Sequence, residues 1–117
     1  MFEKRKTAID GCFELQPAVR EDSRGRFVKT YQRDYFFSND FETEFKEQYY
    51  STSRMGVLRG MHFQNPPQEH TKLVYCTSGL ILDVVLDLRV GSPSYLKYVS
   101  LELSADAGNM LYLPEGL

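Results

Sequence analysis

Residues Leu80–Arg89 read LILDVVLDLR, and this stretch alternates in character with a period of two. Its even positions are all aliphatic, whereas its odd positions mix aliphatic residues with Asp83, Asp87 and Arg89. Successive side chains of a β-strand point to opposite faces of the sheet. The pattern therefore predicts a strand whose even, wholly aliphatic face packs in a core.

Several further stretches have strand-forming composition and are separated by turns rich in glycine, proline, serine and asparagine. They are Gly25–Tyr31, Lys46–Ser53, Val57–Gln64, Leu73–Cys76, Tyr98–Ser104 and Met110–Leu113. Helical periodicity is weak, and the one helix we expect is a short turn near Tyr31–Asn39 with Asp34 as its cap. Many short strands at this spacing favour a sandwich or barrel, so the fold class is all-β.

The bulk properties restrict the class of protein. A chain of 117 residues is long enough for one domain, which we place at residues 1–117. A net charge of −2 does not favour nucleic-acid binding, and no apolar run is long enough to span a membrane. The opening MFEKRK is not followed by the apolar segment of a signal peptide. With only two cysteines, Cys12 and Cys76, we expect reduced thiols and a cytoplasmic location.

Three basic side chains interrupt the apolar strands: Arg59 and His62 in GVLRGMHFQNPP, and Lys72 in KLVYC. In one interpretation they are structural, with stems packed at a sheet edge and charged heads in water. In the other they point into a barrel, where His62 removes a proton, Lys72 stabilises a negative oxygen and Arg59 holds phosphate. The second interpretation requires a bend at Gly60, because residues three apart on a regular strand face opposite ways.

A metal site is the rival chemistry. Small β-barrels bind transition metals through clusters of histidine and carboxylate, but here His62 is followed by Phe63 and Gln64, and the one other histidine is His70. We therefore expect no metal ligands, and no other cofactor. Cys76 lies in an apolar stretch without an evident activating base and is expected to be a structural thiol.

The motifs taken together resemble a known family. In order along the chain, DSRGRF, STSRMGVLRGMHFQNPP, KLVYC, LDVVLDLRVGSP, ELSA and LPEG resemble the dTDP-4-dehydrorhamnose 3,5-epimerase family. The resemblance implies a cupin-type jelly-roll barrel (a double-stranded β-helix) and a homodimer that exchanges an N-terminal arm of about residues 1–30. It also implies cofactor-independent inversion of C3 and/or C5 of a 4-keto-6-deoxy nucleotide sugar, in deoxysugar, rhamnose and surface polysaccharide biosynthesis.

The same resemblance assigns roles to individual residues. His62 falls on the catalytic base, Lys72 on the lysine beside the C4 oxygen of the sugar, and Asp83 on an acidic residue of the pocket wall. Arg59 falls near the substrate phosphates.

Other positions fall on the nucleotide. Arg24 and Phe27 match residues that reach it from the partner subunit. Lys29 stands where the family usually has a glutamate that holds the base, and Glu47 and Gln48 lie in the region near the phosphates.

The family pattern continues past LPEG with a second histidine motif, a tyrosine acid and an aspartate that pairs with the base. The jelly roll is accordingly expected with its C-terminal part missing or shortened. Two alternatives remain open: a non-catalytic domain of the same fold that binds a nucleotide sugar or dimerises, and a metal-dependent cupin enzyme.

Overall fold

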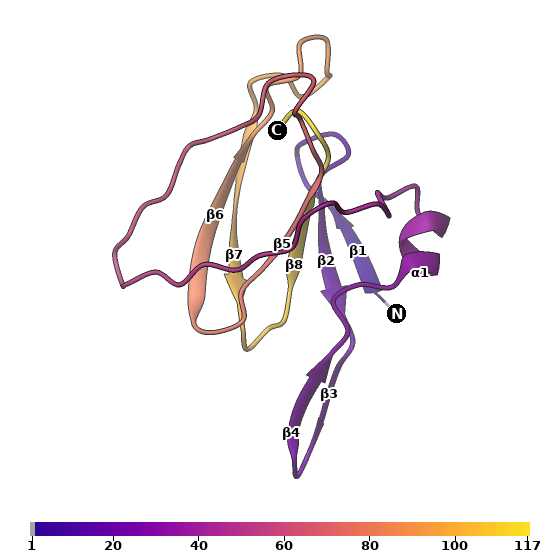
Figure 1. Cartoon of the computed structure of the whole chain (residues 1–117), viewed down its shortest axis with the longest axis vertical. Coiled ribbons are helices and arrows are strands. Elements are labelled where there is room, and N and C mark those ends of the chain that lie inside the picture. The colour runs from indigo at the N-terminus through magenta and orange to yellow at the C-terminus, as the bar shows by residue number, and fades with distance from the viewer. Residues whose placement is uncertain (1) are drawn as a thin grey trace.

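The computed structural model describes residues 2–117, which form eight strands and one helix (Figure 1). The strands are β1 (Phe2–Lys6), β2 (Phe13–Pro17), β3 (Val19–Asp22), β4 (Gly25–Val28), β5 (Lys72–Tyr75), β6 (Leu80–Leu86), β7 (Tyr98–Ser104) and β8 (Met110–Leu113). The helix α1 spans Arg33–Ser38. The expected all-β class is confirmed.

All strand pairs are antiparallel, and they form three sheets. A four-stranded sheet has the order β1-β2-β8-β5, the β6–β7 hairpin forms a second sheet, and the β3–β4 hairpin forms a third. Figure 1 shows β6 and β7 beside the larger sheet, and the β3–β4 hairpin projecting from the lower end of the molecule. We call this β3–β4 hairpin, Val19–Val28, the arm.

The main core lies between β8 and the β6–β7 hairpin. Leu111 and Leu113, which alternate along β8, pack with Val85 of β6 and Leu103 of β7. Leu103 and Leu111 are completely buried. Burial of each such side chain contributes roughly 1.5–3 kcal/mol, so this layer holds the two sheets together.

The other face of β8 packs against aromatic side chains. Met110 and Tyr112 contact a cluster that includes Phe36 of α1 and Phe41. The Phe41 and Tyr112 rings stack with their centroids 4.2 Å apart. The helix therefore covers the outer face of the larger sheet and leaves the inner face to the core.

The helix forms where it was expected, but its cap differs. Its N-cap residue is Gln32, which makes no side-chain capping hydrogen bond, and Asp34 lies in the first turn. There its carboxylate still interacts favourably with the positive end of the helix dipole. With six residues α1 is short, and no helix within residues 2–117 has the length and apolar character that crossing a membrane demands.

The prediction for the buried face of β6 is wrong. Leu80, Leu82 and Val84 are 59%, 65% and 41% exposed, whereas Val85 on the opposite face is 2% exposed. The reason lies in β7, which has one aliphatic face and one largely polar face. The even residues of β6 pair with Ser100, Glu102 and Ser104, and the odd ones pair with Val99, Leu101 and Leu103. Because paired residues share a face, the apolar side of β7 directs the odd face of β6 into the core.

Two expected strands are absent from the described residues. Lys46–Ser53 and Val57–Gln64 belong to a run, 46–68, that has no strand assignment and is exposed throughout. A strand is stabilised by a neighbour that satisfies its backbone groups, and within residues 2–117 this run pairs with none. Composition alone predicted strands there because it carries no information about partners.

Candidate functional site

Lys72 and Asp83 approach each other from opposite sheets. Lys72 begins β5 and pairs with Leu113, a core residue, so its side chain starts on the inner face of the larger sheet. Asp83 pairs with Leu101 and shares the inner face of β6 with Val85. Both residues are partly buried. The registers thus place an ammonium and a carboxylate in the space between the sheets.

His62 is the third member of this group. Burial raises the pKa of the Asp83 carboxyl, and the nearby Lys72 and His62 charges act in the opposite direction. Asp83 makes no direct ion pair with either cation within residues 2–117. Asp83 is therefore a partly desolvated carboxylate, with Lys72 and His62 nearby, that is not locked into a hydrogen-bonded pair. We call His62, Lys72 and Asp83 the inner cluster.

The chain bends sharply just before His62. Gly60 has a φ of +116°, a conformation that side chains with a Cβ rarely adopt. A Cβ placed there would lie 3.3 Å from Nδ1 of His62. Glycine therefore permits both the bend and the close approach of the imidazole ring. Gly60 thus has the special backbone conformation that a bend requires, but it lies in an irregular segment, and Arg59 is held beside Ser53 and Thr52.

Arg24 and Phe27 lie on the arm, which projects away from β5 and β6, the strands that carry Lys72 and Asp83 (Figure 1). Arg24 occupies the turn, where its Nη2 donates to Oδ2 of Asp22 at 2.7 Å and its backbone N–H donates to Oδ1 at 2.9 Å. These bonds hold the pKa of Asp22 below its usual range. Phe27 is 58% exposed, and Lys29, directly after β4, is also exposed.

Glu47, Gln48 and Arg59 lie on the exposed run 46–68. Arg59 is held locally, because its Nε donates to the Ser53 hydroxyl at 2.8 Å and its Nη2 to the Thr52 carbonyl at 3.3 Å. Its guanidinium therefore stays beside its own segment.

The predicted residues fall into separate groups in the structure. Lys72 and Asp83 start from the inner faces of two sheets with His62 near Asp83, and Arg24 and Phe27 lie on one hairpin. No hydrogen bond or ion pair within residues 2–117 connects the arm to the inner cluster. Within one chain, the two groups do not form a single site.

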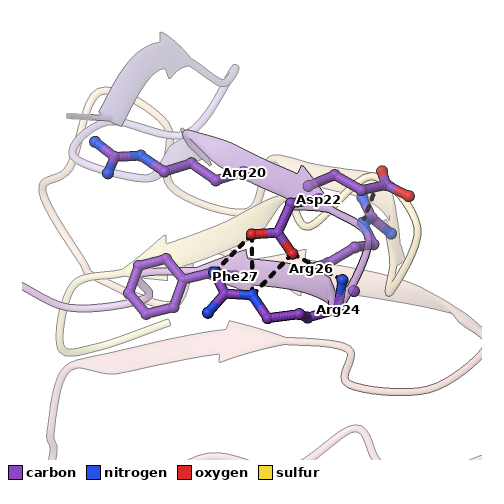
Figure 2. A pocket seen from close by; sticks show the side chains of 7 residues that line it. Arg20, Asp22, Arg24, Arg26 and Phe27 are labelled. Carbon is purple, nitrogen blue, oxygen red and sulfur yellow. Dashed lines mark hydrogen bonds and ion pairs between the residues drawn. The ribbon is translucent and has the colours of Figure 1, made fainter.

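The structure adds one residue to the arm that our sequence analysis did not single out. Arg20 on β3 pairs directly with Phe27 on β4 and lies beside it in the hollow between the strands (Figure 2). The signal was present in the sequence, since the charged residues Arg20, Asp22 and Arg24 stand at every second position. We did not use it because no strand was assigned to residues 19–22.

The side chains also bear on the rival chemistries. Within residues 2–117, no group of three or more histidine, cysteine or acidic side chains is arranged to hold a metal ion. Both cysteines are free thiols. Burial raises the pKa of Cys12 to about 11, so its reactive thiolate form is scarce near neutral pH.

Comparison with known proteins identifies the family. Residues 6–117 match the family model described as dTDP-4-dehydrorhamnose 3,5-epimerase. The Shigella flexneri protein of that name is 38% identical over 112 residues, covering 95% of this chain and 62% of the relative. The chain belongs to the dTDP-4-dehydrorhamnose 3,5-epimerase family.

Solved structures agree with this assignment. The Legionella pneumophila epimerase RmlC, in complex with dTDP-4-keto-L-rhamnose, is 30% identical with a TM-score of 0.92, over 99% of this chain and 62% of that chain. ChmJ of Streptomyces bikiniensis, a 3'-monoepimerase in complex with dTDP-quinovose, is also 30% identical, with a TM-score of 0.82, over 92% of this chain and 55% of that chain.

The comparison confirms the cupin-type jelly roll as the fold of the epimerase family to which this chain belongs. The chain spans 62% of the length of the Shigella relative. The eight described strands therefore match only part of the fold of that relative.

Proposed function

We propose that this chain carries the proton-abstracting part of a nucleotide-sugar epimerase, which inverts C3 and/or C5 of a 4-keto-6-deoxy sugar linked to a nucleoside diphosphate. The observation that carries the proposal is the inner cluster, in which Lys72 and Asp83 start from the inner faces of two sheets of an epimerase-family fold and His62 lies near Asp83. The dTDP-sugars bound to the Legionella and Streptomyces relatives support the substrate class.

The chemistry requires a base and a cation. The C4 ketone acidifies the hydrogens on C3 and C5, so a neutral imidazole at His62 can remove one of them as a proton. The electron pair of the broken C–H bond moves into the ring and gives an enolate with its negative charge on the C4 oxygen. Return of a proton to the opposite face inverts the centre and restores the ketone. Electrons balance without any external oxidant or reductant.

Lys72 is the residue that stabilises the enolate oxygen. Its ammonium lies in the partly buried space between the sheets, where a charge interaction is stronger than in bulk water. Asp83 offsets the charge of Lys72 before substrate binds and helps to position its ammonium. It is a positioning residue in this proposal.

The arm completes the site from a second copy of the chain. Arg24 and Phe27 lie on the arm, which projects from the lower end of the molecule away from β5 and β6 (Figure 1), so they do not join the inner cluster of their own chain. In a homodimer that exchanges this N-terminal region, they would meet the nucleotide in the partner's site. Lys29, Glu47, Gln48 and Arg59 remain candidates for nucleotide or phosphate contacts.

A second candidate is binding of a nucleotide sugar without turnover. It is favoured by the exposure of His62, because a solvent-exposed imidazole exchanges its proton with water and is less able to return that proton to the sugar. This function would use the same residues but would leave C3 and C5 unchanged.

Proton NMR in deuterated water separates the two. With dTDP-4-dehydro-6-deoxyglucose as substrate, the proposal predicts replacement of the C3 or C5 hydrogen by deuterium. His62→Asn should slow this exchange about 10²–10⁴-fold, the usual contribution of a positioned base. His70→Asn is the matched control, because His70 lies in an exposed loop with its Nδ1 3.2 Å from the Gln68 carbonyl. Wild-type exchange in the His62 variant would overturn the proposal, and binding without any exchange would establish the second candidate.

A further inference from the structure

The two faces of the arm have different surroundings. In the β3–β4 register, Glu21 pairs with Arg26 and Arg20 pairs with Phe27, so the two pairs lie on opposite faces. The Arg26 face is turned toward the body, where the guanidinium donates to the carbonyls of Ala105 and Asp106. The Arg20 and Phe27 face is exposed.

The arginines of the arm also differ in their partners. Arg24 forms a close ion pair with Asp22, and Arg26 lies 3.8 Å from a carboxylate oxygen of Glu21. Arg20 makes no hydrogen bond or ion pair within residues 2–117. Figure 2 shows Arg20 and Phe27 extending in the same direction from neighbouring strands, with the Asp22–Arg24 pair beside them. The exposed face therefore presents an unpaired guanidinium next to an accessible aromatic ring.

We propose that Arg20 is a phosphate-binding residue of the arm, which pairs with the diphosphate of a nucleotide whose base lies on the Phe27 ring. This inference rests on the proposed function, since it assigns a role within the same nucleotide-sugar site. The planar guanidinium matches phosphate oxygens and binds them through paired hydrogen bonds. An exposed phenylalanine ring is a stacking surface for any base.

The pairing of Arg24 explains why Arg20 is needed. Arg24 donates through Nε and Nη2 to both oxygens of Asp22, so these donors are already engaged and the pair carries no net charge. Asp22 also places a negative charge on the exposed face, close to where an anion would bind. Arg20 needs no rearrangement and supplies the positive charge that this face otherwise lacks.

The test is the affinity of the 117-residue chain for dTDP, measured by isothermal titration calorimetry at low and high salt. Arg20→Gln keeps the length of the side chain but removes its charge. It should weaken dTDP binding about tenfold at low salt, as expected for loss of a charge-assisted hydrogen bond, and reduce the salt dependence of the affinity. Phe27→Leu should weaken binding without changing the salt dependence.

Arg33→Gln is the matched control, because it removes the same charge from α1 and should change the affinity by less than about twofold. Unchanged dTDP affinity in Arg20→Gln would overturn the inference and leave the proposed function intact. Weaker binding with an unchanged salt dependence would also overturn it, because Arg20 would then act on the base or on the fold. If the wild-type chain does not bind dTDP, both proposals fail. If it binds dTDP but does not exchange the sugar protons, only the proposal of epimerase activity fails.

Discussion

Asp83 on β6 and Asp87 just after it differ in their hydrogen bonds, and their pKa values are shifted in opposite directions. Asp87, just after β6, is fully buried and accepts hydrogen bonds from Arg89, Ser92 and Ser94. These bonds, above all those from Arg89, hold its pKa far below the usual range. Asp83, four residues earlier, is partly buried without such bonds, and burial raises its pKa.

The difference shows how the same residue type serves structure at one position and function at another. A buried carboxylate whose hydrogen-bonding capacity is filled has no remaining interaction to offer a ligand. Asp87 instead joins two distant segments: its partner Arg89 donates to the Asp10 carbonyl, and its partner Ser94 accepts from the Asp10 N–H at 2.9 Å. Asp83 retains free hydrogen-bonding capacity and has Lys72 and His62 nearby, as a site that must accept a substrate requires.

The largest expected effect is on stability, from Asp87→Asn. This change leaves Arg89 without its charged partner, and breaking one side of a buried ion pair typically costs about 3–5 kcal/mol of unfolding free energy. Urea denaturation at pH 7 measures the loss. Asp106→Asn is the control, since Asp106 is exposed and lies 3.8 Å from Arg26, and it should change stability by less than about 0.5 kcal/mol.

The pH dependence of the Asp87 variant follows from the same shift. Because the folded pKa of Asp87 lies below its unfolded value, its contribution to stability is present above about pH 4 and is lost as the pH falls through the folded pKa. The stability difference between wild type and Asp87→Asn should therefore shrink in acid. A variant as stable as the Asp106 control at pH 7 would show that the buried network is not structural.

The second effect is on turnover, from Lys72→Met. Removal of the ammonium should slow proton exchange with the 4-keto sugar about 10²–10³-fold, as for loss of one preorganised charge interaction. The unfolding curve should change little, because Lys72 makes no ion pair within residues 2–117. Lys97→Met, at an exposed position, is the matched control. A change of less than about threefold in Lys72→Met would place this residue outside the site.

The sequence predicted much of the sheet framework. The strands β4 to β8 were expected within a few residues, because their alternating composition is bounded by clear turns. The strands β1 and β3 were missed because they are short and largely charged, and β2 because it is five residues long and ends in Pro17. These strands depend on pairing with neighbours, which periodicity does not report.

The candidate site was predictable to a smaller extent. The grouping of Lys72 with Asp83 depends on the registers of the β5–β8 and β6–β7 strand pairs and on the face of β6, and the face was predicted wrongly. Family resemblance suggested these residues because it carries three-dimensional information that spacing does not. Arg20 was not predicted, because its role depends on its position opposite Phe27 and on the ion pairs of Arg24 and Arg26, which the sequence does not show.

The central claim is that Asp83 is a carboxylate near Lys72 that is free to interact with a ligand, whereas the hydrogen bonds of Asp87 are all used within the fold. Carbon NMR titration of both carboxyl groups tests this claim most directly. The account predicts that Asp83 titrates above the ordinary aspartate range and Asp87 below it. In Lys72→Met, the pKa of Asp83 should rise further, because a cation that favours its charged form is gone, and the pKa of Asp87 should not move. An Asp83 that titrates at or below the ordinary value, or that is unaffected by Lys72→Met, would contradict the account.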